Sequence, residues 1–141
     1  MWRALAVLLA LLSAPAIAAE TLPGPIPARL VRIIDGDTLL VRAHIWLGHE
    51  VTTLVRLLGI DAPELRGRCA EESAAAERAR AFVARVVGRS DVTLTDLRFD
   101  KYGGRVLARV EVRGQDLARA LLAEGLARPY RGKMRAGWCQ T

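Results

Sequence analysis

The sequence predicts a small α+β protein: a five-stranded antiparallel β-barrel with one helix after the third strand and a second helix near the C-terminus. The chain has 141 residues, enough for one domain but not for two sizeable ones. Hydrophobic residues make up 52% of it, which excludes intrinsic disorder, and two cysteines are too few for a disulfide-rich miniprotein. The apolar pattern then changes between strand-like and helix-like stretches in an order that fits such a barrel.

Residues 1–19 have the pattern of a secretory signal peptide. A short basic start at 1–3 precedes an unbroken apolar run at 4–12, and small residues suited to a signal peptidase follow. Cleavage after Ala18 and cleavage after Ala19 both fit. The apolar run is short for a membrane anchor, so we expect a cleaved signal, with an uncleaved anchor helix as the alternative. Export would place the mature chain in the periplasm or outside the cell, without stable membrane association.

A linker and three strands are expected next. Residues 20–28 hold three of the six prolines, which indicates an extended linker ahead of a folded domain at 29–141. Short apolar-rich stretches then alternate with turn and loop residues. We predict strands at 29–34, 38–45 and 50–60.

The second half of the chain predicts a helix, two strands and a further helix. Helix formers dominate residues 70–87, and Gly88 stands where a helix C-cap belongs. Alternating stretches at 91–99 and 105–113 predict two strands, and residues 115–124 predict the last helix, ahead of an irregular basic tail. This order fits the OB-fold, a five-stranded barrel. Two of the connections are too short for parallel crossovers, so we expect antiparallel pairing.

The chain is basic, with 21 Lys and Arg against 15 Asp and Glu, a formal net charge of +6. Without the predicted signal the charge is +5 over 122 residues. A basic surplus favours a polyanionic partner, either a nucleic acid or an anionic membrane surface. Charge alone does not choose between these two partners.

Four carboxylates stand at the ends of the predicted strands: Asp35 and Asp37 at the first turn, Asp61 and Glu64 after the third strand. If these strands pair, the carboxylates converge, and like charges at that separation repel by about 4 kcal/mol per pair at an effective dielectric constant near 20. A positive group should hold them together, and oxygen-only ligands suit a hard cation such as calcium. The alternative is that these acids stand here because turns favour them.

Two arginines are candidates for anion recognition. Arg56 interrupts the apolar segment 54–58, where a guanidinium is costly to bury without a partner, and Arg105 follows a Gly-Gly turn. A buried structural ion pair would explain either residue as well.

Three short motifs follow one another along the domain. They are Asp35-Gly36-Asp37-Thr38, the run RLLGIDAPE from Arg56 to Glu64, and Asp100-Lys101-Tyr102-Gly103 leading to Arg105. In this order and at these separations they resemble the signature blocks of the staphylococcal nuclease-like (thermonuclease) family. Gly125-Leu126-Ala127 is similar to a fourth, weaker block, so the resemblance spans about residues 29–130.

The resemblance implies an OB-fold and calcium-dependent hydrolysis of phosphodiester bonds in DNA and RNA. Asp37 and Asp61 match the family's calcium-binding carboxylates, and the position of Ala62 matches a residue that lends its backbone carbonyl. Glu64 matches the residue assigned to activating the attacking water. Such a role agrees with general acid–base chemistry, because a carboxylate can take a proton from water.

The resemblance also implies the residues that hold the substrate. Arg56 and Arg105 match the arginines that grip the phosphate and stabilise its transition state, a role that suits the guanidinium fork. Lys101, Tyr102 and Tyr130 match nucleotide-binding positions.

Three features depart from the family's commonest pattern. Gly104 is an additional residue ahead of the arginine of the third motif, and Tyr130 is slightly offset from its expected place. The hairpin that precedes Arg56 is longer, with Trp46 and His49 at its tip. None of these departures removes a catalytic side chain.

Cys69 and Cys139 are expected to form a disulfide, because an exported protein meets an oxidising compartment. Such a bond would stabilise the fold by about 4 kcal/mol in the chain-entropy model and tether the C-terminal tail. Two free thiols are the alternative. The spacing of the two cysteines and two histidines does not favour zinc.

Taken together, these features predict a monomeric, secreted or periplasmic, calcium-dependent nuclease acting on DNA and RNA. A noncatalytic OB-fold module that binds nucleic acid is the alternative. A protein of anionic membrane surfaces has only the net charge in its favour.

Overall fold

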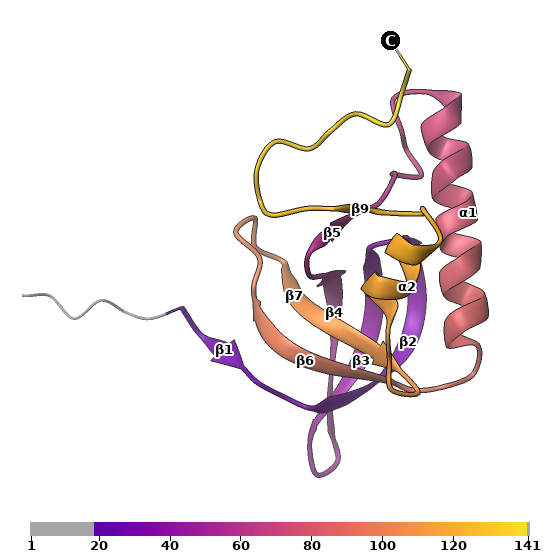
Figure 1. The fold of residues 1–141 in the computed structure, drawn as a ribbon. Helices are drawn as coiled ribbons and strands as arrows, with labels where there is room; N and C mark the ends of the chain where they lie inside the picture. Colours follow the sequence, from indigo (N-terminus) through magenta and orange to yellow (C-terminus); the bar gives the residue numbers. More distant parts are fainter. Residues whose placement is uncertain (1–18, 141) are drawn as a thin grey trace, which may run out of the picture.

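The computed structural model describes residues 19–140, so the predicted signal peptide lies outside the described residues except for Ala19 (Figure 1). Five strands form a closed barrel in which each strand pairs with two neighbours, in the order β6-β2-β3-β4-β7 with β7 returning to β6. These strands are β2 (Ile26–Asp35), β3 (Thr38–Trp46), β4 (His49–Leu57), β6 (Val92–Phe99) and β7 (Arg105–Val112). The predicted five-stranded barrel with two helices is confirmed.

One pairing in the barrel is parallel. β4 and β7 run in the same direction, with Leu54 opposite Arg105 and Leu57 opposite Ala108, whereas the other pairings in the barrel are antiparallel. The prediction of an entirely antiparallel barrel was therefore wrong at this pair. The reason is geometric: directions that alternate around a ring cannot close when the number of strands is odd. The chain between β4 and β7 contains β5, α1 and β6, so it is long enough for a parallel crossover.

The predicted linker at 20–28 is part of the sheet instead. β1 (Thr21–Leu22) pairs with the end of β6, and β2 begins at Ile26, where it also pairs with β6. The prolines in this segment do not prevent this, because their fixed φ is compatible with extended backbone at the edge of a sheet. Figure 1 shows β1 extending from one side of the barrel.

The chain leaves the barrel after β4 and forms a second, two-stranded sheet. β4 ends at Leu57, a turn with Gly59 at φ +82° follows, and β5 (Ile60–Asp61) then pairs with β9 (Arg128–Pro129). The strand predicted to continue to residue 60 is therefore interrupted. The tail predicted to be irregular contributes β9, which brings the C-terminal segment next to Asp61.

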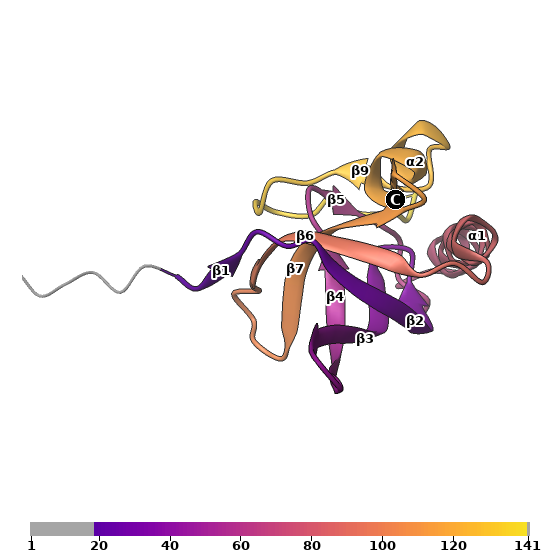
Figure 2. The same cartoon turned by 90° about the horizontal axis from the view of Figure 1, so that it is seen from below.

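Helix α1 (Ala70–Val87) covers one side of the barrel, as Figures 1 and 2 both show. Ala76, Ala79 and Val83 are fully buried on its inner face. A Cβ on Gly36 would lie 2.7 Å from the Cβ of Ala79, so only glycine lets the β2–β3 turn approach the helix this closely. Within residues 19–140, no helix is long and apolar enough to cross a membrane.

The short second helix packs against β7 and α1. α2 (Leu117–Ala123) follows β8 (Gln115–Asp116) and begins two residues later than predicted, because the Asp116 side chain caps it by accepting a hydrogen bond from the backbone N–H of Arg119. The core beneath the two helices is aliphatic. Its largest fully buried side chains are Leu39, Val41, Val55, Leu57, Ile60, Val83, Val87, Val92, Leu94, Val110, Leu117 and Leu121.

Candidate active site

Arg56 joins the two predicted metal-binding carboxylates. Its Nη1 lies 3.0 Å from Oδ2 of Asp37, and its Nη2 lies 3.3 Å from Oδ1 of Asp61. Nη2 also donates to the carbonyl oxygen of Ile60 at 3.3 Å. Asp37 and Asp61 are only 3% and 4% exposed, so the structure brings together two buried acids and the buried arginine between them.

Backbone and side-chain donors orient Asp37. The hydroxyl of Thr38 donates to Oδ1 at 2.9 Å, and the backbone N–H of Ala62 donates to Oδ2 at 2.8 Å. The N–H of Leu57 donates to the carbonyl oxygen of Asp37, also at 2.8 Å. These bonds fix the β2–β3 turn against the segment that carries Asp61, and they explain why the two acidic motifs meet.

Asp35 anchors the loop that follows β5. Its Oδ1 accepts a hydrogen bond from the backbone N–H of Leu65 at 2.9 Å. Burial, helped by the charges of Asp37 and Glu64, raises the pKa of Asp35 above its ordinary value, against the lowering effect of the Leu65 hydrogen bond. Among residues 19–140, the Asp35 side chain forms a hydrogen bond only to this loop, so we assign Asp35 a structural role.

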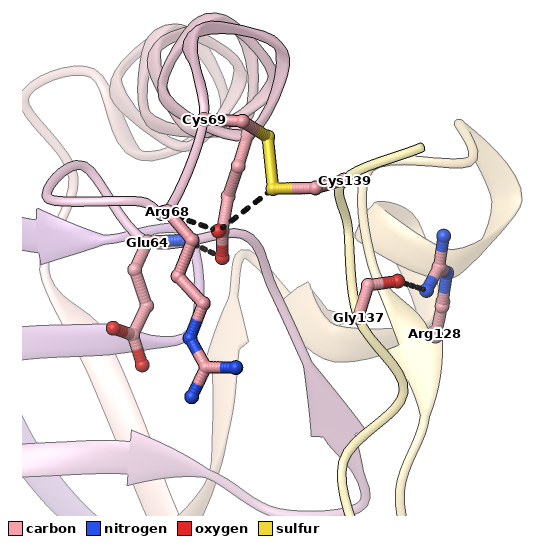
Figure 3. Close-up of a disulfide and its surroundings, with 7 residues drawn as sticks. Glu64, Arg68, Cys69, Arg128, Gly137 and Cys139 are labelled. Atoms are coloured by element: carbon pink, nitrogen blue, oxygen red, sulfur yellow. Dashed lines mark hydrogen bonds between the residues drawn. A yellow bond between two sulfur atoms is a disulfide. The ribbon is translucent and has the colours of Figure 1, made fainter. Parts of the chain in front are cut away.

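Glu64 lies in the loop between β5 and α1, and its side chain is 48% exposed. The buried carboxylate of Glu72, in the first turn of α1, holds the backbone of this loop. Glu72 accepts hydrogen bonds from the N–H of Glu64 at 3.4 Å and from the N–H of Arg68 at 2.8 Å. Gly67 packs so closely on Glu72 that an added Cβ would lie 2.6 Å from its Cγ. Figure 3 shows Glu64 and Arg68 on this loop.

Arg105 stands at the start of β7 and pairs with Asp100 instead of the other acids. Its Nε donates to Oδ2 of Asp100, which is 7% exposed. Burial alone would raise the pKa of Asp100, but the hydrogen bond and charge of Arg105 outweigh it and hold that pKa below its ordinary value. Gly103 and Gly104 both adopt φ +69°, so the additional glycine forms part of the turn that precedes Arg105.

Two tyrosines stand near the arginines. Tyr102 is 73% exposed, with Nζ of Lys101 4.9 Å and Cζ of Arg105 5.9 Å from its ring centre. The ring of Tyr130 lies 5.8 Å from Cζ of Arg56, and its backbone N–H donates to Gly59 at 2.9 Å. These contacts place the predicted substrate-binding residues around the two arginines.

One cleft of about 1360 Å³ contacts most of these residues. Seven of the eight residues predicted for catalysis, metal binding and substrate binding line it: Asp37, Arg56, Glu64, Lys101, Tyr102, Arg105 and Tyr130. Asp61 is the exception, because Arg135 and Trp138 of the C-terminal tail lie against it.

A scan against protein-family models matches residues 54–137, more than half of the chain, to the staphylococcal nuclease homologue family. The chain belongs to this family. A search of curated proteins found no match. The matched segment contains Arg56, Asp61, Glu64 and Arg105, and it begins after the turn that supplies Asp37.

The C-terminal tail adds a feature to this member of the staphylococcal nuclease family. Cys69 and Cys139 form the expected disulfide, with 6.0 Å between their Cα atoms (Figure 3). The bond fixes the tail to the start of α1. Sγ of Cys139 lies 3.8 Å from Oε2 of Glu72, a contact without a donated hydrogen because the sulfur is oxidised.

The tail places two further side chains on the acids. Arg135 contacts Asp61 through Nε at 2.7 Å and Glu64 through Nη1 at 2.6 Å, and Nε1 of Trp138 donates to Oδ2 of Asp61 at 3.3 Å. Partial burial lowers the pKa of Arg135, but the Glu64 hydrogen bond and the Asp61 charge outweigh it, and the net shift is upward. The sequence did not predict a site role for Arg135, Trp138 or Glu72. Two features of the sequence pointed to this region: the tail is basic, and it contains Cys139.

The donor chemistry of Asp37 and Asp61 fits a hard cation. Both offer carboxylate oxygens, and both face the guanidinium of Arg56. Asp61 also faces the guanidinium of Arg135. Within residues 19–140, three side-chain ligand atoms of His, Cys, Asp or Glu come within 4.8 Å of one another only at Cys69, Glu72 and Cys139. The expected convergence of Asp35, Asp37, Asp61 and Glu64 is therefore limited: no three of these carboxylates lie that close together. The sulfurs of that group are bonded to each other, so it has no thiolate to offer a metal.

Proposed function

We propose that the protein is an exported, calcium-dependent nuclease that hydrolyses phosphodiester bonds of DNA and RNA. Family membership supports nuclease-like chemistry on a nucleic acid. The observation on which the proposal chiefly rests is the meeting of Asp37, Arg56 and Asp61 beside a cleft lined by Glu64 and Arg105. Acids, arginines and an exposed candidate base are the groups that metal-assisted phosphoryl transfer needs.

In this proposal the carboxylates divide into two roles. The buried pair Asp37 and Asp61 binds calcium, which would supply positive charge for the phosphate oxygens and the attacking water. Glu64 is half-exposed at the cleft, where it can accept a proton from water. Glu72 holds the backbone of Glu64, so the position of the candidate base depends on a buried carboxylate of α1.

The arginines bind the phosphate from two strands. Arg56 is fixed between the acids, and Asp100 holds Arg105 against the same cleft. Their guanidinium groups can donate to phosphate oxygens in pairs and stabilise the charge that develops there. The exposed ring of Tyr102 and the nearby charge of Lys101 suit a stacked base and its neighbouring phosphate, and Tyr130 offers a second ring.

Export to the periplasm or the outside is part of the proposal. The N-terminal pattern of residues 1–19 and the Cys69–Cys139 disulfide support it, because structural disulfides are typical of oxidising compartments. We propose that the mature chain acts as a monomer without stable membrane association.

The experiment uses the mature chain from residue 20 with single-stranded DNA and with RNA, in calcium and in excess EGTA. We expect cleavage of both substrates in calcium and none in EGTA, with the activity restored when calcium is added back. A noncatalytic binding module would instead show salt-dependent binding with no products. That second function has one observation in its favour, since Arg135 contacts both Asp61 and Glu64.

A further inference from the structure

The guanidinium of Arg135 lies between two residues that the proposed reaction needs. Nε is 2.7 Å from Oδ1 of Asp61, the proposed calcium ligand, and Nη1 is 2.6 Å from Oε1 of Glu64, the proposed base. The side chain is 39% exposed, so it reaches the acids from the solvent side of the site. The Arg135 side chain therefore contacts the carboxylates of Asp61 and Glu64 at the same time.

Both carboxylate oxygens of Asp61 accept hydrogen bonds. Oδ1 faces Arg135 and also Nη2 of Arg56 at 3.3 Å, and Oδ2 accepts from Trp138 at 3.3 Å. A divalent cation on Oδ1 would meet two guanidinium groups of like charge on the same atom. Arg56 is buried and also bonded to Asp37, whereas Arg135 is partly exposed on a tail. Arg135 is therefore the group that can move away.

The tail is held in place at both of its ends. β9 pairs with β5 on one side, and the Cys69–Cys139 disulfide closes the other side, four residues beyond Arg135. Between them, Cζ of Arg128 lies 3.8 Å from the ring centre of Trp138. Nη1 of Arg128 also donates to the carbonyl oxygen of Gly137 at 2.8 Å, a hydrogen bond that Figure 3 shows. A short tether of this kind gives Arg135 a high effective concentration at the acids.

We infer that Arg135 is a further residue of the active site, a tethered cation that competes with the metal for Asp61 and Glu64 and so sets the metal affinity. This inference rests on the proposed calcium role of Asp61. The C-terminal tail, which lies outside the three sequence motifs, would then take part in the reaction. Opening of the disulfide would lower the local concentration of Arg135 and raise the metal affinity of the site.

The test measures calcium binding to the mature protein by isothermal titration calorimetry, without substrate. We expect Arg135→Gln to bind calcium about tenfold more tightly than wild type, since two charge-assisted contacts no longer compete. Lys133→Gln is the matched control, because it removes the same charge from the same tail and Lys133 forms no ion pair within residues 19–140. An unchanged or weaker affinity of Arg135→Gln would overturn the inference, as would an equal gain in Lys133→Gln.

A second measurement follows the tail itself by hydrogen exchange. We expect the backbone amides of residues 131–138 to exchange faster when calcium is added to wild type, and the disulfide-free variant Cys69→Ser/Cys139→Ser to bind calcium more tightly than wild type. Slower or unchanged exchange would contradict competition. If calcium binds wild type and Arg135→Gln equally and DNA is still cleaved, only this inference fails; if neither protein binds calcium, the proposed function fails with it.

Discussion

Arg56 and Asp37 form a buried ion pair across the site, with 3.0 Å between Nη1 and Oδ2 and side-chain exposures of 10% and 4%. Removal of the arginine would leave Asp37 and Asp61 close together without their shared cation. We expect Arg56→Leu to lower the free energy of unfolding by about 3–5 kcal/mol, measured by urea titration in EGTA. The control Arg89→Leu changes an exposed arginine and should stay within about 0.5 kcal/mol of wild type. Equal stability of the two variants would show that the pair is not a structural element.

Glu64 should matter for the reaction and little for folding. Its side chain is half-exposed, and the Glu64→Gln variant keeps the size of the side chain but removes the base. We expect the cleavage rate to fall by about 10²–10⁴-fold with an unchanged midpoint of thermal unfolding. Glu71→Gln, an exposed acid on α1, should cleave like wild type. Full activity of Glu64→Gln would remove Glu64 from the mechanism.

Glu72 should influence the reaction through the position of the loop. Glu72→Leu would leave the N–H groups of Glu64 and Arg68 without their acceptor, and we expect a loss of about 1–3 kcal/mol in unfolding free energy together with a lower kcat. Glu72→Gln keeps an acceptor oxygen, so it should recover part of both losses. Glu77→Gln, on the exposed face of the same helix, provides the control. A Glu72→Leu enzyme with wild-type kcat would rule out this positioning role.

The Cys69–Cys139 bond links positions 70 residues apart. In the chain-entropy model, a loop of that length is worth about 4 kcal/mol, so the reduced protein should unfold at a clearly lower urea concentration. Mass spectrometry of the exported protein should find it two hydrogens lighter than the reduced chain. Two thiols that react with an alkylating agent before any reduction would contradict the disulfide.

Asp100 should make stability depend on pH in the acidic range. Arg105 holds its pKa below the ordinary value of 3.8, despite the opposing effect of burial, so folding favours the charged form. The stabilisation is then fully present above pH 3.8 and is lost as the pH falls through the lower pKa of the folded state. Comparison of wild type with Asp100→Asn from pH 7 to pH 2 should show a stability difference that shrinks only at the acidic end. Asp91→Asn, at a 70% exposed side chain, controls for the lost charge, and a pH-independent difference for Asp100→Asn would contradict the assignment.

Much of the barrel could be predicted because its strands and helices have clear local patterns. The helix at 70–87 was predicted with the bounds that the structure has, since helix formers end at Gly88. The parallel β4–β7 pair and the strands within 20–28 could not be predicted in the same way. Both features depend on pairing with a strand that is distant in the sequence. The local β-propensity of a segment does not show which strand it will pair with.

In the site, too, residues within local motifs could be predicted, and residues that arrive through distant contacts could not. Asp37, Arg56 and Asp61 belong to motifs whose residue types and separations indicate chemistry, so their convergence could be expected. Glu72 and Arg135 belong to no motif, and they reach the site through the packing of α1 and through a tail tied by a distant disulfide. A single basic residue in a basic tail gives no signal of its own before the chain is folded.

Cleavage of nucleic acid by this chain should depend on calcium held by Asp37 and Asp61. The most direct test adds calcium stepwise to the EGTA-treated mature protein and measures the release of short products from single-stranded DNA. We predict a saturable restoration of cleavage that Asp61→Asn weakens strongly. Cleavage that persists in EGTA, or DNA binding without any product at saturating calcium, would contradict this calcium dependence.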